Sequence, residues 1–197
     1  MVNIISFIAL IIAITIHEFS HALVADRLGD PTPRSQGRLS LNPLKHLDPI
    51  GTVMMLVARF GWGKPVPIDP YNFSHPKRDE LFVALAGPVS NLILASFLAI
   101  VYRFFPVSII FVIAIINIYL AIFNLLPIPP LDGSKIFLNL LPQEKSVEWA
   151  EAFDRYGSFL LIALIFLPIG GSNIVSLVIS PIVNFILGLL FSGSGGQ

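Results

Sequence analysis

The sequence predicts an all-α, multi-pass membrane protein with about five to six transmembrane helices. Two observations carry this prediction. Hydrophobic residues make up 55% of the 197-residue chain and charged residues only 12%, whereas a soluble domain has about a quarter charged residues. The apolar residues also gather in five runs, each close to the roughly 20 residues that a helix needs to cross a bilayer. The runs are 3–25, 81–104, 107–126, 147–167 and 174–190.

The first run carries ionisable residues inside its apolar sequence. His17, Glu18 and His21 belong to the motif His-Glu-Phe-Ser-His. Two histidines four residues apart lie on one face of a helix, so both can bind one metal ion, and the glutamate beside them can act as a base. Such side chains cost about 2.5–3.5 kcal/mol each in a membrane and persist mainly where they function. The alternative is that the histidines only form interhelical hydrogen bonds.

The segment between the first two runs contains several distinct elements. Residues 37–49 are rich in turn formers, and their Asn-Pro and Asp-Pro pairs disfavour a continuing helix. His46 and Asp48 could form a second metal site there, but we expect them to be structural and hydrogen-bonded to each other. Residues 49–60 are half apolar and too short to span, so they are expected to dip into the membrane or lie along its surface. Prolines extend residues 61–69, which form either an exposed strand edge or a surface linker.

The basic residues predict the orientation of the chain. Eleven of the 12 Lys and Arg residues follow the first or the third run, and only Arg103, at the end of the second run, faces the other side. Because positive loops face the cytoplasm, the N-terminus is predicted outside and the two histidines nearer the cytoplasmic half. The third run ends at three prolines just before Asp132. That residue is therefore expected on the same side as the histidines.

Two histidines leave a catalytic zinc site incomplete, because such a site usually takes three protein ligands and keeps one position open. The chain has no cysteine, so the remaining ligand must be a histidine or a carboxylate. Asp132 is the best candidate, since it follows a proline-broken segment that is tolerable in a membrane where it lines protein or a wet cavity. The local sequence is equally compatible with Asp132 capping a helix that begins at Gly133.

Together these motifs resemble the site-2 protease family of intramembrane zinc metalloproteases, in a compact form without a PDZ domain. The segment 17–21 is similar to the family's metal motif. Residues 124–133, Asn-Leu-Leu-Pro-Ile-Pro-Pro-Leu-Asp-Gly, are similar to its second signature, N-x-x-P-x-x-x-x-D-G, whose aspartate binds zinc. Residues 87–91, Gly-Pro-Val-Ser-Asn, resemble a looser motif, G-x-x-x-N, whose asparagine faces the catalytic chamber. Glycine and asparagine in a membrane helix can equally serve close packing and interhelical hydrogen bonding.

The resemblance implies a metalloendopeptidase that hydrolyses peptide bonds in or near transmembrane segments, either in regulated intramembrane proteolysis or in the clearance of signal-peptide remnants. One Zn²⁺ per chain would be bound by His17, His21 and Asp132. Glu18 would be the catalytic base, and Asn91 a candidate contact to the substrate or the oxyanion. The family also places β-structured elements near residues 61–69. The rival hypothesis is a membrane metal carrier or scaffold without proteolytic activity.

The expected partners are a transmembrane protein or peptide substrate and the lipid bilayer of the cell membrane. Zero net charge gives no indication of nucleic-acid binding, and the sequence leaves the oligomeric state undetermined. Residues 1–191 are expected to form a single integral membrane domain. Residues 192–197 contain only Gly, Ser and Gln, and are expected to form a flexible tail.

Overall fold

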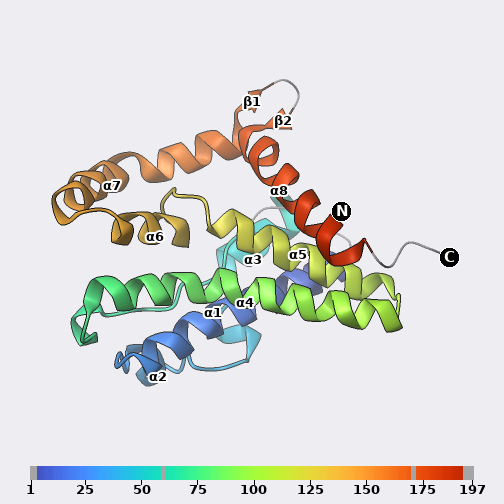
Figure 1. Ribbon diagram of the computed structural model, residues 1–197, viewed down its shortest axis with the longest axis horizontal. Helices are drawn as coiled ribbons and strands as arrows, with labels where there is room; N and C mark the ends of the chain where they lie inside the picture. Colours follow the sequence, from blue (N-terminus) through green and yellow to red (C-terminus); the bar gives the residue numbers. More distant parts are fainter. Residues whose placement is uncertain (1–3, 59–60, 170–171, 193–197) are drawn as a thin grey trace.

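The computed structural model describes residues 4–58, 61–169 and 172–192 (Figure 1). Of the predicted tail, 192–197, residues 193–197 lie outside these residues. The helices are α1 Ile4–Arg27, α2 Thr32–Ser35, α3 Pro49–Ala58, α4 Pro76–Phe104, α5 Ser108–Asn124, α6 Asp132–Leu140, α7 Gln143–Phe166 and α8 Ile174–Phe191, with 3-10 turns η1 Pro43–Lys45 and η2 Pro70–Asn72. Strands β1 Pro168–Ile169 and β2 Ser172–Asn173 pair antiparallel. Apart from this short hairpin, the described chain is all-α, as predicted.

The helices support a membrane protein, but they do not establish how many of them span the membrane. In the described residues, α1 and α4 are long and apolar enough to cross a membrane, whereas α5 and residues 176–191 of α8 are apolar but shorter. Helix α7 contains nearly all of the fourth predicted run, 147–167, but begins four residues before it. The first half of this helix is polar, with Glu144, Lys145, Glu148 and Glu151. The finer prediction of five to six spans therefore remains a proposal.

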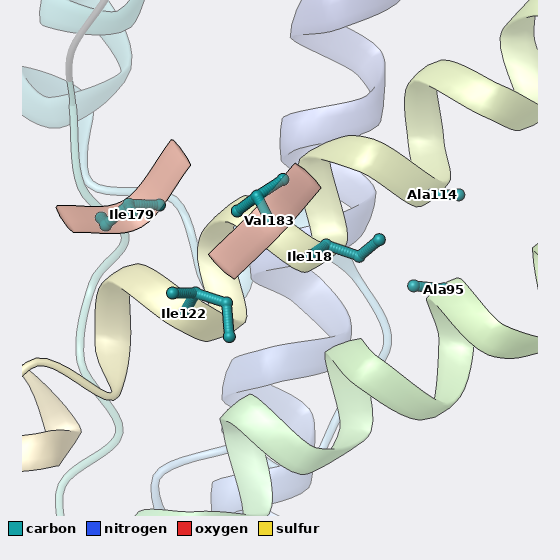
Figure 2. Close-up of a cluster of buried hydrophobic side chains, with 6 residues drawn as sticks. All are labelled: Ala95, Ala114, Ile118, Ile122, Ile179 and Val183. Atoms are coloured by element: carbon teal, nitrogen blue, oxygen red, sulfur yellow. The ribbon is translucent and has the colours of Figure 1, made fainter. Parts of the chain in front are cut away.

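Helix α4 organises the packing, because its most extensive contacts are with α5 and α1. Figure 2 shows the cluster of buried side chains that joins α4, α5 and α8; its members are Ala95, Ala114, Ile118, Ile122, Ile179 and Val183. The alanines let the helix backbones approach closely, which is how helices pack in an apolar environment. Helices α7 and α8 are connected by the short hairpin at one edge of the molecule (Figure 1).

The half-apolar run between the first two predicted spans forms α3, a helix of 10 residues. Its first turn packs directly on the backbone that follows: a Cβ added to Gly51 would lie 2.2 Å from the carbonyl oxygen of Trp62. Among the described residues of this segment, the expected β-structure is reduced to one antiparallel bridge, between Leu47 and Gly63. A short helix packed against extended chain thus occupies the place predicted for a re-entrant or β element. Its position relative to a membrane stays a prediction.

His46 and Asp48 are structural, as expected, but their predicted pairing with each other was wrong. His46 is fully buried, and its Nε2 atom lies 2.6 Å from the carbonyl oxygen of Ser40. Asp48 instead accepts a hydrogen bond of 2.7 Å from the backbone N–H of Gly51, in the first turn of α3. Each side chain therefore forms a hydrogen bond with a nearby backbone group and not with the other side chain. Neither belongs to a metal-ligand cluster in the described chain.

Asp30 connects the end of α1 to the segment that follows the β bridge. It is fully buried and accepts hydrogen bonds from the backbone N–H of Thr32 at 3.0 Å, the backbone N–H of Asp69 at 2.9 Å and the side-chain amide of Asn72 at 2.9 Å. Burial alone would raise the pKa of Asp30, but these hydrogen bonds outweigh it and hold the pKa below its ordinary value. The carboxylate thereby anchors one end of residues 61–69 to α1.

We expect Asp30→Ala to lower the free energy of unfolding by about 1–3 kcal/mol at neutral pH, because it removes three hydrogen bonds to a buried carboxylate, two of them from half-buried backbone N–H groups. Since the folded-state pKa is lowered, this stabilisation is present above the unfolded-state pKa of about 3.9 and is lost as the pH falls through the lower folded value. Unfolding of the purified protein in detergent measures the effect. The exposed Asp154→Ala is the matched control, expected within about 0.5 kcal/mol. Equal losses in both variants would contradict the assignment.

Candidate metal centre

Helix α1 carries the two histidines of the sequence motif on one face, one turn apart. Both are buried, with 4% of His17 and 7% of His21 exposed. Their rings meet edge to face, with centroids 4.6 Å apart. The helix continues without interruption through both residues, so the four-residue spacing alone brings the two imidazoles together. The two rings thus lie together as the motif predicts, and their role as metal ligands stays a prediction.

Asp132 reaches the histidines from a different element. It is the first residue of α6, after the proline-rich connection from α5, which contains a cis Pro129–Pro130 peptide bond. Its Oδ2 atom lies 3.0 Å from Nε2 of His17 and 3.3 Å from Nε2 of His21. The structure therefore directs this carboxylate at the histidines, as the third-ligand hypothesis predicts, instead of at the backbone of its own helix.

The three side chains have the geometry of a metal site. Their ligand atoms all lie within 4.8 Å of one another. A tetrahedral zinc site with bonds of about 2.0–2.2 Å separates its ligands by about 3.3 Å, which matches both distances to Asp132. Two imidazole nitrogens and one carboxylate oxygen are also a donor set that zinc accepts. The residues present thus fit the metal that the motif predicts.

The second nitrogen of each ring faces a hydrogen-bond acceptor on α4. Nδ1 of His17 lies 2.6 Å from Oδ1 of Asn91, and Nδ1 of His21 lies 2.7 Å from the carbonyl oxygen of Val83. An acceptor at Nδ1 places the proton there, which leaves the lone pair of Nε2 available to a metal. Because Val83 contributes only its backbone, no sequence motif could have indicated this contact.

Asn91 forms the interhelical hydrogen bonds that the sequence offered as the alternative to a substrate contact. It is fully buried, and besides its oxygen contact to His17 its side-chain nitrogen donates to the carbonyl oxygen of Ala13 at 3.0 Å and to Oδ1 of Asn117 at 2.7 Å. The amide therefore connects α1, α4 and α5 behind the metal site. Asn117 was not predicted to have a role here, and the only signal was an uncharged polar residue inside an apolar run. A contact between Asn91 and the substrate stays an untested prediction.

Gly87 explains how α4 comes so close to the two imidazole rings. A Cβ added to this residue would lie 2.4 Å from Nε2 of His21 and 2.6 Å from both Cε1 and Nε2 of His17. These distances are shorter than real Cβ contacts allow. The glycine of the G-x-x-x-N motif therefore makes room for the ligands, and the asparagine one turn later contacts one of them.

Glu18 lies beside the ligands on α1, and its Oε2 atom accepts a hydrogen bond of 3.1 Å from the backbone N–H of Val66. Glu18 and the three ligands line one cavity of about 1200 Å³. The rest of its wall is largely apolar and comes from several helices, including residues Leu10, Ile14, Leu120, Phe123, Leu161 and Ile179. The three candidate ligands and Glu18 therefore open onto a mostly apolar cavity.

Comparison with known proteins defines the family. Residues 103–167 match the family model described as Peptidase family M50. The chain is 41% identical over 191 residues to YwhC of Bacillus subtilis, named as a candidate zinc metalloprotease, and this match covers 90% of the chain and 84% of YwhC. The chain belongs to peptidase family M50. This is the site-2 protease family that its motifs resemble, and the chain is a membrane-associated zinc metalloprotease of that family.

Two further proteins that the chain is similar to are longer than it. The chain is 32% identical over 170 residues to Rip2 of Mycolicibacterium smegmatis, across 80% of the chain and 65% of Rip2. It is 28% identical over 188 residues to the zinc metalloprotease MJ0392 of Methanocaldococcus jannaschii, across 91% of the chain but only 47% of MJ0392. The chain thus spans about half the length of that relative. No solved structure matches it significantly.

Proposed function

We propose that this M50 protease hydrolyses peptide bonds within or next to the transmembrane segments of other membrane proteins. The observation that carries the proposal is the convergence of His17, His21 and Asp132 at an apolar cavity, with the carboxylate of Glu18 in the same wall. A soluble peptide would gain little from such a wall, whereas an apolar segment would be stabilised by contact with it. The natural substrates would be membrane-anchored signalling proteins or signal-peptide remnants.

The proposed mechanism assigns each polar residue one task. His17, His21 and Asp132 would bind one Zn²⁺ per chain, and this ion supplies the Lewis acidity that activates water and polarises a carbonyl group. Glu18 takes the proton of the attacking water and passes it to the leaving amine. Asn91 holds the ring of His17 in the orientation that directs Nε2 toward Asp132.

The proposed location is the cell membrane, with the N-terminus outside and the active site toward the cytoplasmic half. Four apolar helices support a membrane location, and the excess of basic residues after the first and third predicted runs supports this orientation. In such a topology Arg27, at the end of α1, marks the cytoplasmic end of the helix. The site lies ten residues before it at His17, about 15 Å along a helix.

The test is zinc content and peptide cleavage measured on the same purified protein. We expect about one zinc per chain, cleavage of a model transmembrane peptide, and loss of both on treatment with a strong chelator, with recovery when zinc is added back. Asp132→Ala is expected to lose both properties, because two histidines alone leave the site short of a ligand. Bound zinc without cleavage of any tested peptide would favour a carrier or scaffold. Absence of zinc from the untreated protein would overturn the site.

We expect Asn91→Ala to weaken zinc binding by about tenfold to a hundredfold, because the ring of His17 loses the acceptor that orients it. Competition with a chromogenic chelator measures the zinc dissociation constant. The matched control is Asn184→Ala on α8, whose side chain is exposed, and it is expected to bind zinc like the wild type. Unchanged zinc affinity in Asn91→Ala together with a raised KM would instead support the predicted substrate contact.

A further inference from the structure

Arg38 is a buried cation outside the metal site. Only 5% of it is exposed, and arginine is rarely buried unless it is paired. Its guanidinium group pairs with backbone: Nη1 donates to the carbonyl oxygen of Pro65 at 2.9 Å, and Nη2 donates to the carbonyl oxygen of Lys64. Two such charge-assisted hydrogen bonds hold neighbouring carbonyl groups in a defined direction. Arg38 therefore fixes the backbone of residues 64–65.

The same backbone reaches Glu18. The carbonyl group of Pro65 and the N–H of Val66 are the two ends of one peptide group, and the N–H donates to Oε2 of Glu18 at 3.1 Å. Because a trans peptide group is planar, its C=O and N–H point in opposite directions and move together. A hydrogen bond to the carbonyl also strengthens the donor at the other end. Arg38 on one side thus orients the donor that meets Glu18 on the other.

The local sequence leaves few backbone N–H groups in this segment that could donate to Glu18. Pro65 and Pro67 have no N–H, so Val66 provides the one backbone donor between them. The N–H of Lys64 is already used, since it donates to the carbonyl oxygen of His46 at 2.7 Å. The antiparallel bridge at Gly63 is the one strand-like pairing in this part of the described chain. Beyond it the extended segment depends on side chains such as Arg38 for its position.

We propose that Arg38 is a positioning residue for Glu18, acting through the peptide group that joins Pro65 and Val66. The proposal rests on the proposed function, because it matters for catalysis only if Glu18 is the base. Among the described residues, Arg38 neither contacts the metal ligands nor lines the cavity itself, whereas Pro65, whose carbonyl oxygen it binds, and Val66 do line the cavity. Its effect on hydrolysis would therefore pass through the orientation of one carboxylate.

A double-mutant cycle tests the proposal on the full-length protein in detergent. The probe is a model transmembrane peptide with a helix-weakening Gly-Pro pair, and its cleavage by the wild type is measured first. Arg38→Gln removes the charge and the bidentate contact, and Val66→Pro removes the N–H while keeping the backbone extended. Each is expected to lower kcat by roughly tenfold to a hundredfold, which is less than the roughly hundredfold to ten-thousandfold that a general base contributes because the carboxylate is displaced but not removed. KM and zinc content are expected to stay unchanged.

Non-additivity is the decisive result. If Arg38 acts through the Val66 N–H, the double variant loses no more activity than Val66→Pro alone. Arg38→Lys, which keeps the charge and donors, is expected to recover part of kcat. Arg34→Gln is the matched control, because Arg34 is exposed and pairs with Asp26; it is expected to match the wild type. Losses that multiply, or a raised KM at unchanged kcat, would overturn the proposal and indicate that the segment binds substrate independently.

A second readout does not depend on cleavage. We expect amide hydrogen exchange of residues 61–68, measured by mass spectrometry, to be faster in Arg38→Gln than in the wild type and in Arg34→Gln. Unchanged exchange would overturn the proposal even if no peptide were cleaved. Glu18→Gln in the cleavage assay distinguishes a failure of the role proposed for Arg38 from a failure of the role proposed for Glu18. Cleavage lost in Glu18→Gln but intact in Arg38→Gln overturns this inference alone, whereas full activity of Glu18→Gln overturns the base assignment itself.

Discussion

Glu18→Gln is expected to lower kcat for peptide hydrolysis by roughly a hundredfold to ten-thousandfold while zinc remains bound. Glutamine has nearly the same shape, and its side-chain oxygen can still accept the hydrogen bond from the Val66 N–H that Oε2 of Glu18 accepts now. It cannot take a proton from water. The ligand atoms of the metal site are untouched, because they belong to His17, His21 and Asp132.

The measurement for Glu18→Gln pairs turnover of a transmembrane peptide with zinc content of the same sample. Glu148→Gln is the matched control, since Glu148 is exposed in the polar half of α7, and its turnover should equal that of the wild type. Activity within a few-fold of the wild type in Glu18→Gln would disprove the role of this carboxylate as the base. Loss of zinc together with activity would assign Glu18 to the metal site instead.

Gly87→Ala is expected to remove zinc binding and activity together. Its loss of zinc affinity should exceed the roughly hundredfold that results when a hydrogen-bond partner of a metal ligand is removed. The added methyl group would lie 2.4–2.6 Å from atoms of both imidazole rings, so the rings or the helix must move. Alanine favours helix over glycine by about 1 kcal/mol. The helix itself should therefore survive, and circular dichroism should show unchanged helix content.

Gly188→Ala provides the control for Gly87→Ala. Gly188 is also a helical glycine, on α8, but a Cβ added there meets nothing within 4 Å. We expect this variant to bind zinc and cleave peptide like the wild type, with equal or greater thermal stability. Wild-type zinc affinity in Gly87→Ala would mean that the approach of α4 to the histidines is not required for the site.

Several features of the site could be predicted because they depend on residues close together in the sequence. The spacing of His17 and His21 places both on one face of any helix, and the structure confirms it. The prolines before Asp132 correctly predicted the end of a helix there. The number of spans was harder to predict. The fourth predicted run, 147–167, corresponds to α7, which begins at Gln143 and has a polar first half.

Other features depend on which helices pack together, and no local pattern contains that information. Composition and helical periodicity depend on neighbouring residues, so they were sufficient to predict the apolar helical class and the motif on α1, and the local motifs were sufficient to indicate the family. The tertiary structure decided that Asp132 completes the cluster, that Asn91 contacts His17, and that a peptide group anchored by Arg38 meets Glu18. These contacts join residues far apart in the chain, so their geometry follows from the close approach of α1, α4 and α6 and from the loop packed beside them.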